Sequence, residues 1–198
     1  MRHDLFPLFL NLRDRRCVVI GAGPVAEGKI DGLLRSGAEI IVVAPQATQQ
    51  VEHWAASSRI TLHRRAFTSS DLHGAFLVIV ATPSAETNHA IADEARRRNI
   101  LCNVVDDPDY CDFFYPAIVR RGALQIAIST AGASPTLAKN IRERLEAQFG
   151  PEYEDWLEEV NTRRREILAS VPDPEERRKK LEALVSDESF HAFKDRSE

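Results

Sequence analysis

The stretch "RCVVIGAGPVAEGK" (16–29) decides how this chain folds. It begins as an apolar strand, passes through a glycine turn and continues with the spacing of a helix. In the turn, Gly21 permits a sharp bend, Gly23 lets the backbone approach a pyrophosphate, and Ala26 allows the helix to pack closely on the strand. The pattern GxGxxA between a strand and a helix favours a dinucleotide-binding turn over an ordinary tight turn.

Strand and helix patterns alternate on the C-terminal side of this turn. Further apolar strands are predicted at 39–45, 75–83 and 100–106, with helices at 24–38 and 85–99. Apolar strands separated by helices are typical of a parallel sheet that is covered on both faces. The sequence therefore predicts the α/β class, with an N-terminal NAD(P)-binding Rossmann fold.

The alternation stops after Asp112. The segment 113–130 reads as two strands that are too close in sequence for a crossover helix, so an antiparallel pair is expected. A helix follows at 133–149, and everything from 150 on has helical spacing. The sequence thus predicts three parts: a Rossmann domain (1–112), a small α+β domain for dimerisation and substrate binding (113–149), and a helical domain (150–198).

The end of the second predicted strand lacks a residue that many NAD sites have. An Asp or Glu usually stands there to bind the ribose 2′-hydroxyl, but here the strand ends in Ala44, Pro45 and Gln46. No arginine follows at once to bind a 2′-phosphate, so these residues leave NAD and NADP open. Gln46 either serves the ribose as a neutral hydrogen-bonding group or belongs to a simple turn. Thr82, after a later strand, either contacts the cofactor or caps the next helix.

Four aspartates fall within seven residues of the stretch "CNVVDDPDYCDFFYPAIV" (102–119). Asp106 either forms a turn like its neighbours or, as expected here, closes a buried strand and projects into the cleft where a nicotinamide lies. Partial burial would raise its pKa into a range useful for proton transfer. Asp107, Asp109 and Asp112 are interpreted as turn and cap residues.

Composition excludes several other classes of protein. The net charge of −4 gives no reason to expect nucleic acid or an anionic membrane as a partner, and no apolar run reaches transmembrane length. The three cysteines show no CxxC spacing and indicate reduced thiols in a cytoplasmic protein. The six histidines show no ligand spacing, so no metal site is predicted.

Four segments together resemble a known family. They are "LFLNLRDRRCVVIGAGPVAEGKIDGLLRSGAEIIVVAP" (8–45), "VIVATPSAETN" (78–88), "CNVVDDP" (102–108) and "FFYPAIVRRGALQIAISTAGASPTLAKNIRERLE" (113–146). In this order they closely resemble precorrin-2 dehydrogenase, the N-terminal dehydrogenase and chelatase module of siroheme synthases. The resemblance covers roughly residues 3–149.

The resemblance implies an activity and a set of site residues. Members of the family are homodimers that oxidise precorrin-2 to sirohydrochlorin with NAD⁺, and some also insert Fe²⁺. The implied cofactor residues are Gly21, Gly23, Pro24, Val25, Pro45 and Gln46, and the implied catalytic carboxylate is Asp106. Thr82 is added as a cofactor residue from its place after a strand. The family shares the missing acid, which points to NAD.

The implied substrate carries eight carboxylates and needs cations and helix N-termini around it. The candidates for binding it are Arg120, Arg121, Thr130, Ser134 and Lys139. The two arginines are equally well explained as a solvated hairpin tip, and Ser134 as a helix cap. Relatives that are phosphorylated carry a serine at the position of Thr130, which puts regulation by that route in doubt here.

Two other functions compete with that of a precorrin-2 dehydrogenase. An NAD-sensing regulatory protein would use the same fold without catalysis, and a chelatase would keep the glycine turn only as a scaffold. A short-chain dehydrogenase needs Tyr-x-x-x-Lys, which none of the three tyrosines provides.

Overall fold

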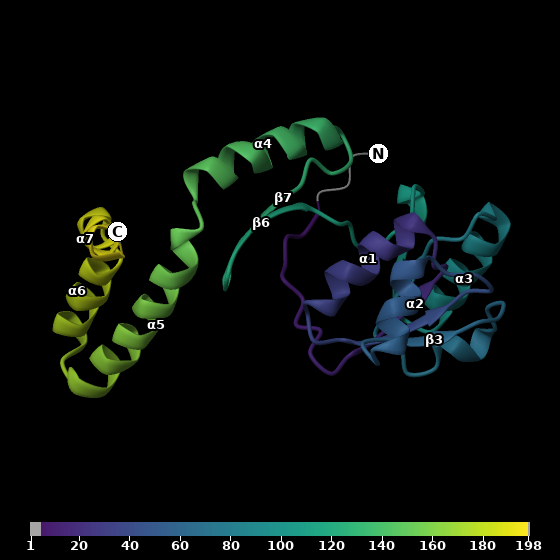
Figure 1. The fold of residues 1–198 in the computed structure, drawn as a ribbon, viewed down its shortest axis with the longest axis horizontal. Helices are drawn as coiled ribbons and strands as arrows, with labels where there is room; N and C mark the ends of the chain where they lie inside the picture. The colour runs from purple at the N-terminus through teal and green to yellow at the C-terminus, as the bar shows by residue number, and fades with distance from the viewer. Residues whose placement is uncertain (1–4, 198) are drawn as a thin grey trace. The chain divides into compact units, whose positions relative to one another are not determined.

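The structure is a computed structural model that describes residues 5–197 (Figure 1). The chain divides into two compact units, one ending at Phe114 and one beginning at Tyr115. We describe each unit by itself. The three-part division predicted from the sequence stays a prediction.

The first unit is built on a five-stranded parallel sheet in the order β3-β2-β1-β4-β5. Its strands are β1 (Arg16–Ile20), β2 (Glu39–Val43), β3 (Thr61–His63), β4 (Leu77–Val80) and β5 (Leu101–Val104). The chain adds β2 and β3 on one side of β1, then returns to add β4 and β5 on the other. The gap between the loops after β1 and β4 is thus a topological switch point, where open α/β sheets bind their ligands.

Helices cover both faces of this sheet, as predicted (Figure 1). They are α1 (Pro24–Leu34), α2 (Gln49–Ala56) and α3 (Ala85–Arg97). Neighbouring residues of a strand point to opposite faces. Val19 therefore packs in one cluster with Ile30 of α1, while Val18 packs in the other with Ile91 of α3.

No element was predicted between residues 46 and 74, where the structure has α2, β3 and the short helix η1 (Ser69–Leu72). Helix α2 has eight residues and buries only Val51 and Trp54, so it offers little periodicity. Strand β3 has three residues and lies at the edge of the sheet. Elements this short give almost no pattern, and tertiary packing decides them.

The second unit contains a hairpin and four helices. Strands β6 (Ala117–Arg121) and β7 (Leu124–Ile128) pair antiparallel, as predicted. The helices are α4 (Pro135–Gln148), α5 (Glu152–Ser170), α6 (Pro174–Leu184) and α7 (Asp187–Ser197). Helix α4 contacts both strands, and α5 contacts α6 and α7. This confirms the predicted helical C-terminal region. Within residues 5–197, no helix has the length and apolarity that a bilayer crossing needs.

The thiols of Cys17 and Cys102 are expected to be unreactive in the folded protein. Both are buried in the sheet, and burial raises the pKa of Cys17 to about 11 and that of Cys102 to about 12. Only thiolates react readily with disulfide reagents. Titration with such a reagent at pH 8 should therefore detect at most one fast thiol, Cys111, before unfolding and three afterwards. Two fast thiols in the native protein would contradict this packing.

Candidate dinucleotide and active site

The segments that follow four of the parallel strands meet at one edge of the sheet. In the ladders, Ile20 at the end of β1 is paired with Val43 and with Val80, and Val80 is paired with Val104. The four strands thus end level with one another. The segments beyond them carry all the cofactor residues and the catalytic residue predicted from the sequence: Gly21, Gly23, Pro24, Val25, Pro45, Gln46, Thr82 and Asp106.

Gly21 has two independent reasons to be glycine. Its φ is +107°, a conformation that other residues rarely adopt. A Cβ at this position would also lie 2.2 Å from the carbonyl oxygen of Ala81. The loops after β1 and β4 are therefore in direct backbone contact at the switch point.

Gly23 is glycine for a different reason. It is the N-cap of α1 with φ −79° and ψ −178°, which any residue can adopt. Among the described residues, no atom lies within 4 Å of where its Cβ would be, and no side chain caps the first amides of α1. The space in front of this helix end therefore fits a phosphate group that approaches the backbone closely. Beside it, Val25 is 54% exposed.

The loop after β2 is tied to the glycine turn. The amide of Thr48 donates to the carbonyl oxygen of Ala22 at 3.0 Å, and the Thr48 hydroxyl donates to Oε2 of Glu27 at 2.7 Å. Pro45 and Gln46 in this loop are exposed. The sequence analysis missed Glu27, although its position directly after the GxGxxA pattern places it in the first turns of α1.

Thr82 shapes the loop after β4. Its hydroxyl donates to Oδ1 of the buried Asn88 at 2.5 Å, and the Asn88 amide donates back to the Thr82 carbonyl at 3.1 Å. The N-cap of α3 is Ser84, which accepts a hydrogen bond from the amide of Thr87 at 3.2 Å. The alternative in which Thr82 itself caps the helix is therefore wrong, because the cap lies two residues further on.

Asp106 does not lie at the end of a strand, contrary to the expectation from the sequence. Strand β5 ends at Val104, and Asp106 lies in the following turn with φ +61°. The turn is closed by the amide of Asp107, which donates to the carbonyl of Val104 at 3.3 Å. Asp106 is exposed, so the chain itself does not supply the partial burial that the sequence led us to expect. A left-handed conformation costs an ordinary residue about 1–2 kcal/mol, and aspartate adopts it more readily than most.

Two of the other three aspartates fasten this turn to its surroundings. Oδ2 of Asp107 lies 2.6 Å from Nε2 of His89 on α3. Oδ2 of Asp112 accepts a hydrogen bond from the amide of Cys102 at 2.9 Å, and the Asp112 amide donates to the Cys102 carbonyl at 2.8 Å. Asp109 is exposed on the short helix η2 (Pro108–Tyr110). Asp107 and Asp112 are thus anchors of the loop.

A cation from α1 faces the same turn. Burial lowers the pKa of the Lys29 ammonium, and the negative charge of Asp106 acts against that shift. Cys111 is held by the loop, since its thiol donates to the carbonyls of Val104 (3.1 Å) and Asp107 (3.2 Å). Sequence reasoning missed both Lys29 and His89, because each acts on the turn from a distant part of the chain.

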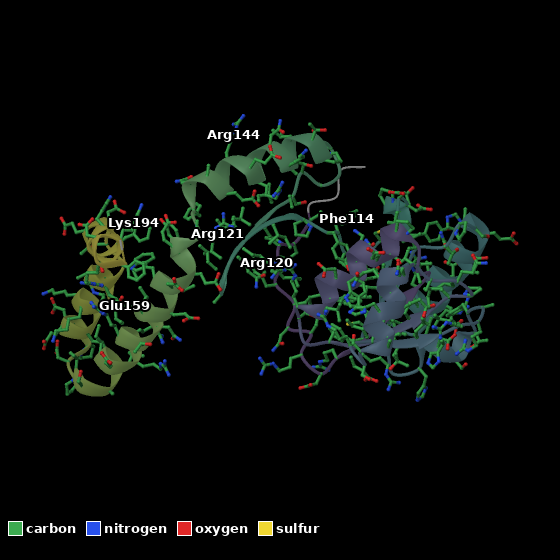
Figure 2. The ribbon with its side chains drawn as sticks, in the orientation of Figure 1. Phe114, Arg120, Arg121, Arg144, Glu159 and Lys194 are labelled. Carbon is green, nitrogen blue, oxygen red and sulfur yellow. The ribbon has the colours of Figure 1, made fainter. Side chains whose placement is uncertain are left out.

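The predicted substrate-binding residues lie in the second unit. Arg121 reaches from β6 to the end of α4, where Nε donates to the carbonyl of Phe149 at 2.7 Å and Nη2 to that of Glu146 at 3.0 Å (Figure 2). It therefore satisfies carbonyls at a helix C-terminus. Arg120 on the same strand is exposed.

The structure brings Thr130 and Ser134 together. The Thr130 hydroxyl donates to the Ser134 carbonyl at 3.1 Å and accepts from the Ser134 amide at 3.2 Å. The Ser134 hydroxyl caps α4 by accepting from the amide of Leu137 at 3.2 Å. Lys139 is exposed, with Nζ 3.8 Å from Oε1 of Glu143. Substrate binding by these residues stays a prediction.

The described part of the chain does not bring three His, Cys, Asp or Glu side chains together in an arrangement that would hold a metal ion. A metal ion inserted into a tetrapyrrole would be a substrate, so this finding concerns only a resident metal.

Comparisons with known proteins agree with the resemblance described above. Residues 8–117 match the family described as "Putative NAD(P)-binding", and residues 121–148 match "Sirohaem biosynthesis protein central". Siroheme synthase of Methylococcus capsulatus is 38% identical over 175 residues, which is 88% of this chain and 37% of the relative. Siroheme synthase of Xylella fastidiosa is 41% identical over 183 residues, 92% of this chain and 38% of the relative. The chain thus spans less than half the length of these relatives.

A solved structure matches along the whole chain. The precorrin-2 dehydrogenase SirC has a TM-score of 0.80 and 27% sequence identity, over 97% of this chain and 98% of that one. The likeness includes the α/β fold of the first unit and continues through the helical C-terminal region. The first unit accordingly has the site of a nicotinamide cofactor. The chain belongs to the NAD(P)-binding family of sirohaem biosynthesis, in which precorrin-2 dehydrogenase and the N-terminal part of siroheme synthases are found.

Proposed function

We propose that this chain oxidises precorrin-2 to sirohydrochlorin with NAD⁺. The observation that carries the proposal is the match to a precorrin-2 dehydrogenase over nearly the full length of both chains. The glycine turn and the Asp106 turn support it, because they lie at the same edge of the sheet. NAD rather than NADP is favoured because the family that the chain resembles shares the missing acid and uses NAD⁺, and no arginine or lysine follows β2 in the segment 44–50.

The reaction removes a hydride and a proton from the macrocycle. NAD⁺, when bound, supplies the hydride acceptor. The first amides of α1 hold its pyrophosphate, and the open space beside Gly23 lets the phosphates come close. The carboxylate of Asp106 accepts the proton, and the ammonium of Lys29 lies close enough to interact with the charge of that carboxylate.

We propose that the working form is a homodimer, as in the family that the chain resembles. The hairpin β6–β7 forms a sheet of only two strands, so each strand is an edge strand that a second copy could pair with. Leu137 on α4 is 48% exposed. Light scattering on a size-exclusion column should give twice the 22.2 kDa chain mass. A monomeric mass at micromolar concentration would contradict a stable dimer.

The proposed function is tested by incubating the pure protein anaerobically with precorrin-2 and NAD⁺. We expect NADH and the sirohydrochlorin spectrum to appear together. Addition of Fe²⁺ afterwards tests metal insertion against a reaction without protein. A protein that binds NAD⁺ but forms no NADH would contradict the proposal and would favour a sensor or a chelatase.

His89 is expected to act as a positioning residue for Asp106. Its ring stacks on Tyr110 with centroids 4.0 Å apart and holds Asp107, the residue next to Asp106, at 2.6 Å. Replacing His89 by alanine should lower kcat by about 5–10-fold, in line with the loss of one hydrogen bond worth about 1 kcal/mol. The KM for NAD⁺ should stay unchanged.

A double-mutant cycle separates this role from a general loss of structure. In an Asp106→Asn background, His89→Ala should cause little further loss of kcat, because both changes act on one group. Additive losses would exclude positioning through Asp106. His73→Ala removes an exposed histidine of the same unit and should leave the rate at the wild-type level.

A further inference from the structure

We infer that Glu27, held in place by Thr48, makes this dinucleotide site select NAD over NADP. The inference rests on the nicotinamide-cofactor site of the proposed function and assigns its specificity to residues on α1 and at the start of α2. No acid at the end of β2 can bind the ribose 2′-hydroxyl, and we assign that role to the carboxylate of Glu27 on α1.

The carboxylate of Glu27 stands where two parts of the site meet. Thr48 joins them, because its amide donates to Ala22 in the glycine turn and its hydroxyl donates to Glu27 on α1. Thr48 is also the N-cap of α2, with its hydroxyl accepting from the amide of Val51 at 3.3 Å. Thr48 therefore ties Glu27 to the glycine turn through its amide and to the start of α2 through its hydroxyl.

This junction is where a Rossmann fold distinguishes its cofactors. The adenosine ribose is bound between the glycine turn and the residues after the second strand, and an acid there accepts from the 2′-hydroxyl. Pro45 and Gln46 carry no charge. Glu27 uses Oε2 for Thr48, and its Oε1 has no hydrogen-bond partner among the described residues. That oxygen is available to accept a hydrogen bond from a ribose hydroxyl.

The surroundings of Glu27 disfavour a 2′-phosphate. A cavity of about 530 Å³ opens beside the carboxylate and is lined by Glu27, Thr48, Gln49, Gln50 and His53, with no lysine or arginine. The first amides of α2 would by themselves attract an anion. Glu27 already places a carboxylate there, so a 2′-phosphate would meet a negative charge without a neutralising cation. At an effective dielectric constant near 20, this repulsion changes an affinity by about tenfold or more.

The experiment measures the dissociation constants of NAD⁺ and NADP⁺ by calorimetry at pH 8, without tetrapyrrole. The wild-type protein should prefer NAD⁺. Glu27→Gln keeps an acceptor for Thr48 and removes the charge, so it should narrow the NAD⁺/NADP⁺ preference by about tenfold or more, chiefly by tightening NADP⁺. Thr48→Val should narrow the NAD⁺/NADP⁺ preference less than Glu27→Gln does, and Thr48→Ser should retain the wild-type preference.

Glu52→Gln is the matched control. Glu52 lies on α2 and pairs with Arg64, so the variant removes one carboxylate from a neighbouring position and should leave the preference unchanged. An unchanged preference in a stably folded Glu27→Gln protein would overturn the inference, as would a wild-type preference for NADP⁺. If dinucleotide selection follows Glu27 but precorrin-2 is not oxidised, the inference stands and only the proposed reaction fails.

Discussion

Replacement of Asp106 by asparagine should lower the rate of NADH formation from precorrin-2 by at least about a hundredfold. Asparagine keeps the size of the side chain and accepts no proton, and loss of a general base typically costs 10²–10⁴ in rate. It also adopts the left-handed conformation that this turn requires, so the backbone should not change. The dissociation constant of NAD⁺ should stay within about twofold of wild type, because the predicted pyrophosphate site lies on α1.

Asp109→Asn is the matched control for this variant. Asp109 lies three residues further along, on the exposed side of η2, and makes no hydrogen bond through its side chain within the described part of the chain. Its variant should turn over at the wild-type rate. An Asp106→Asn protein that is as fast as wild type would remove Asp106 from the mechanism and leave the proton to another group.

Gly21→Ala should give the largest loss of stability among single changes near the site. The added methyl would meet the Ala81 carbonyl at 2.2 Å, and the backbone φ of +107° disfavours any side chain. Relief of the clash must separate the loops after β1 and β4. We expect a cost of about 3 kcal/mol or more, seen as a melting temperature lower by roughly 6–12 °C. NAD⁺ should bind at least about tenfold more weakly.

Gly37→Ala isolates the conformational part of this cost. Gly37 has φ +72°, but a Cβ there would lie 3.7 Å from Cα of Arg13, an ordinary contact. Its variant should lose about 1–2 kcal/mol and bind NAD⁺ normally. If Gly21→Ala proved no worse than Gly37→Ala by both measurements, contact between the two loops would not matter to the site.

The sequence was a good guide to the sheet because its strands are buried on both faces. Residues 17–20 are apolar without interruption, which marks a central parallel strand in any context. The glycine turn could be predicted for a different reason: the backbone conformation of Gly21 strongly disfavours any residue with a side chain. Ser134 and Pro135 likewise mark the start of α4, because capping depends on adjacent residues.

The parts that the sequence did not reveal depend on contacts between distant residues. Nothing near His89 indicates that its ring holds Asp107, 18 positions later. The hydrogen bond between Thr48 and Glu27 spans 21 positions and exists only because β2 returns the chain to the glycine turn. Asp106 was placed too near the strand because the apolar run continues through Val105, whereas the ladder ends at Val104. The length of a ladder depends on its neighbouring strand.

The two ends of the loop that contains Asp106 are hydrogen-bonded to each other. The Asp112 side chain accepts a hydrogen bond from the amide of Cys102, and the Asp112 amide donates to the carbonyl of Cys102, so the nine residues between them form a closed loop. Lengthening a closed loop costs little free energy, since each doubling of a flexible loop costs only about 0.6 kcal/mol. Insertions and deletions here would leave the sheet in register. Natural variation or protein engineering can therefore change the surface that this loop would present to a large substrate, while the glycine turn and the loop after β2 keep their structure.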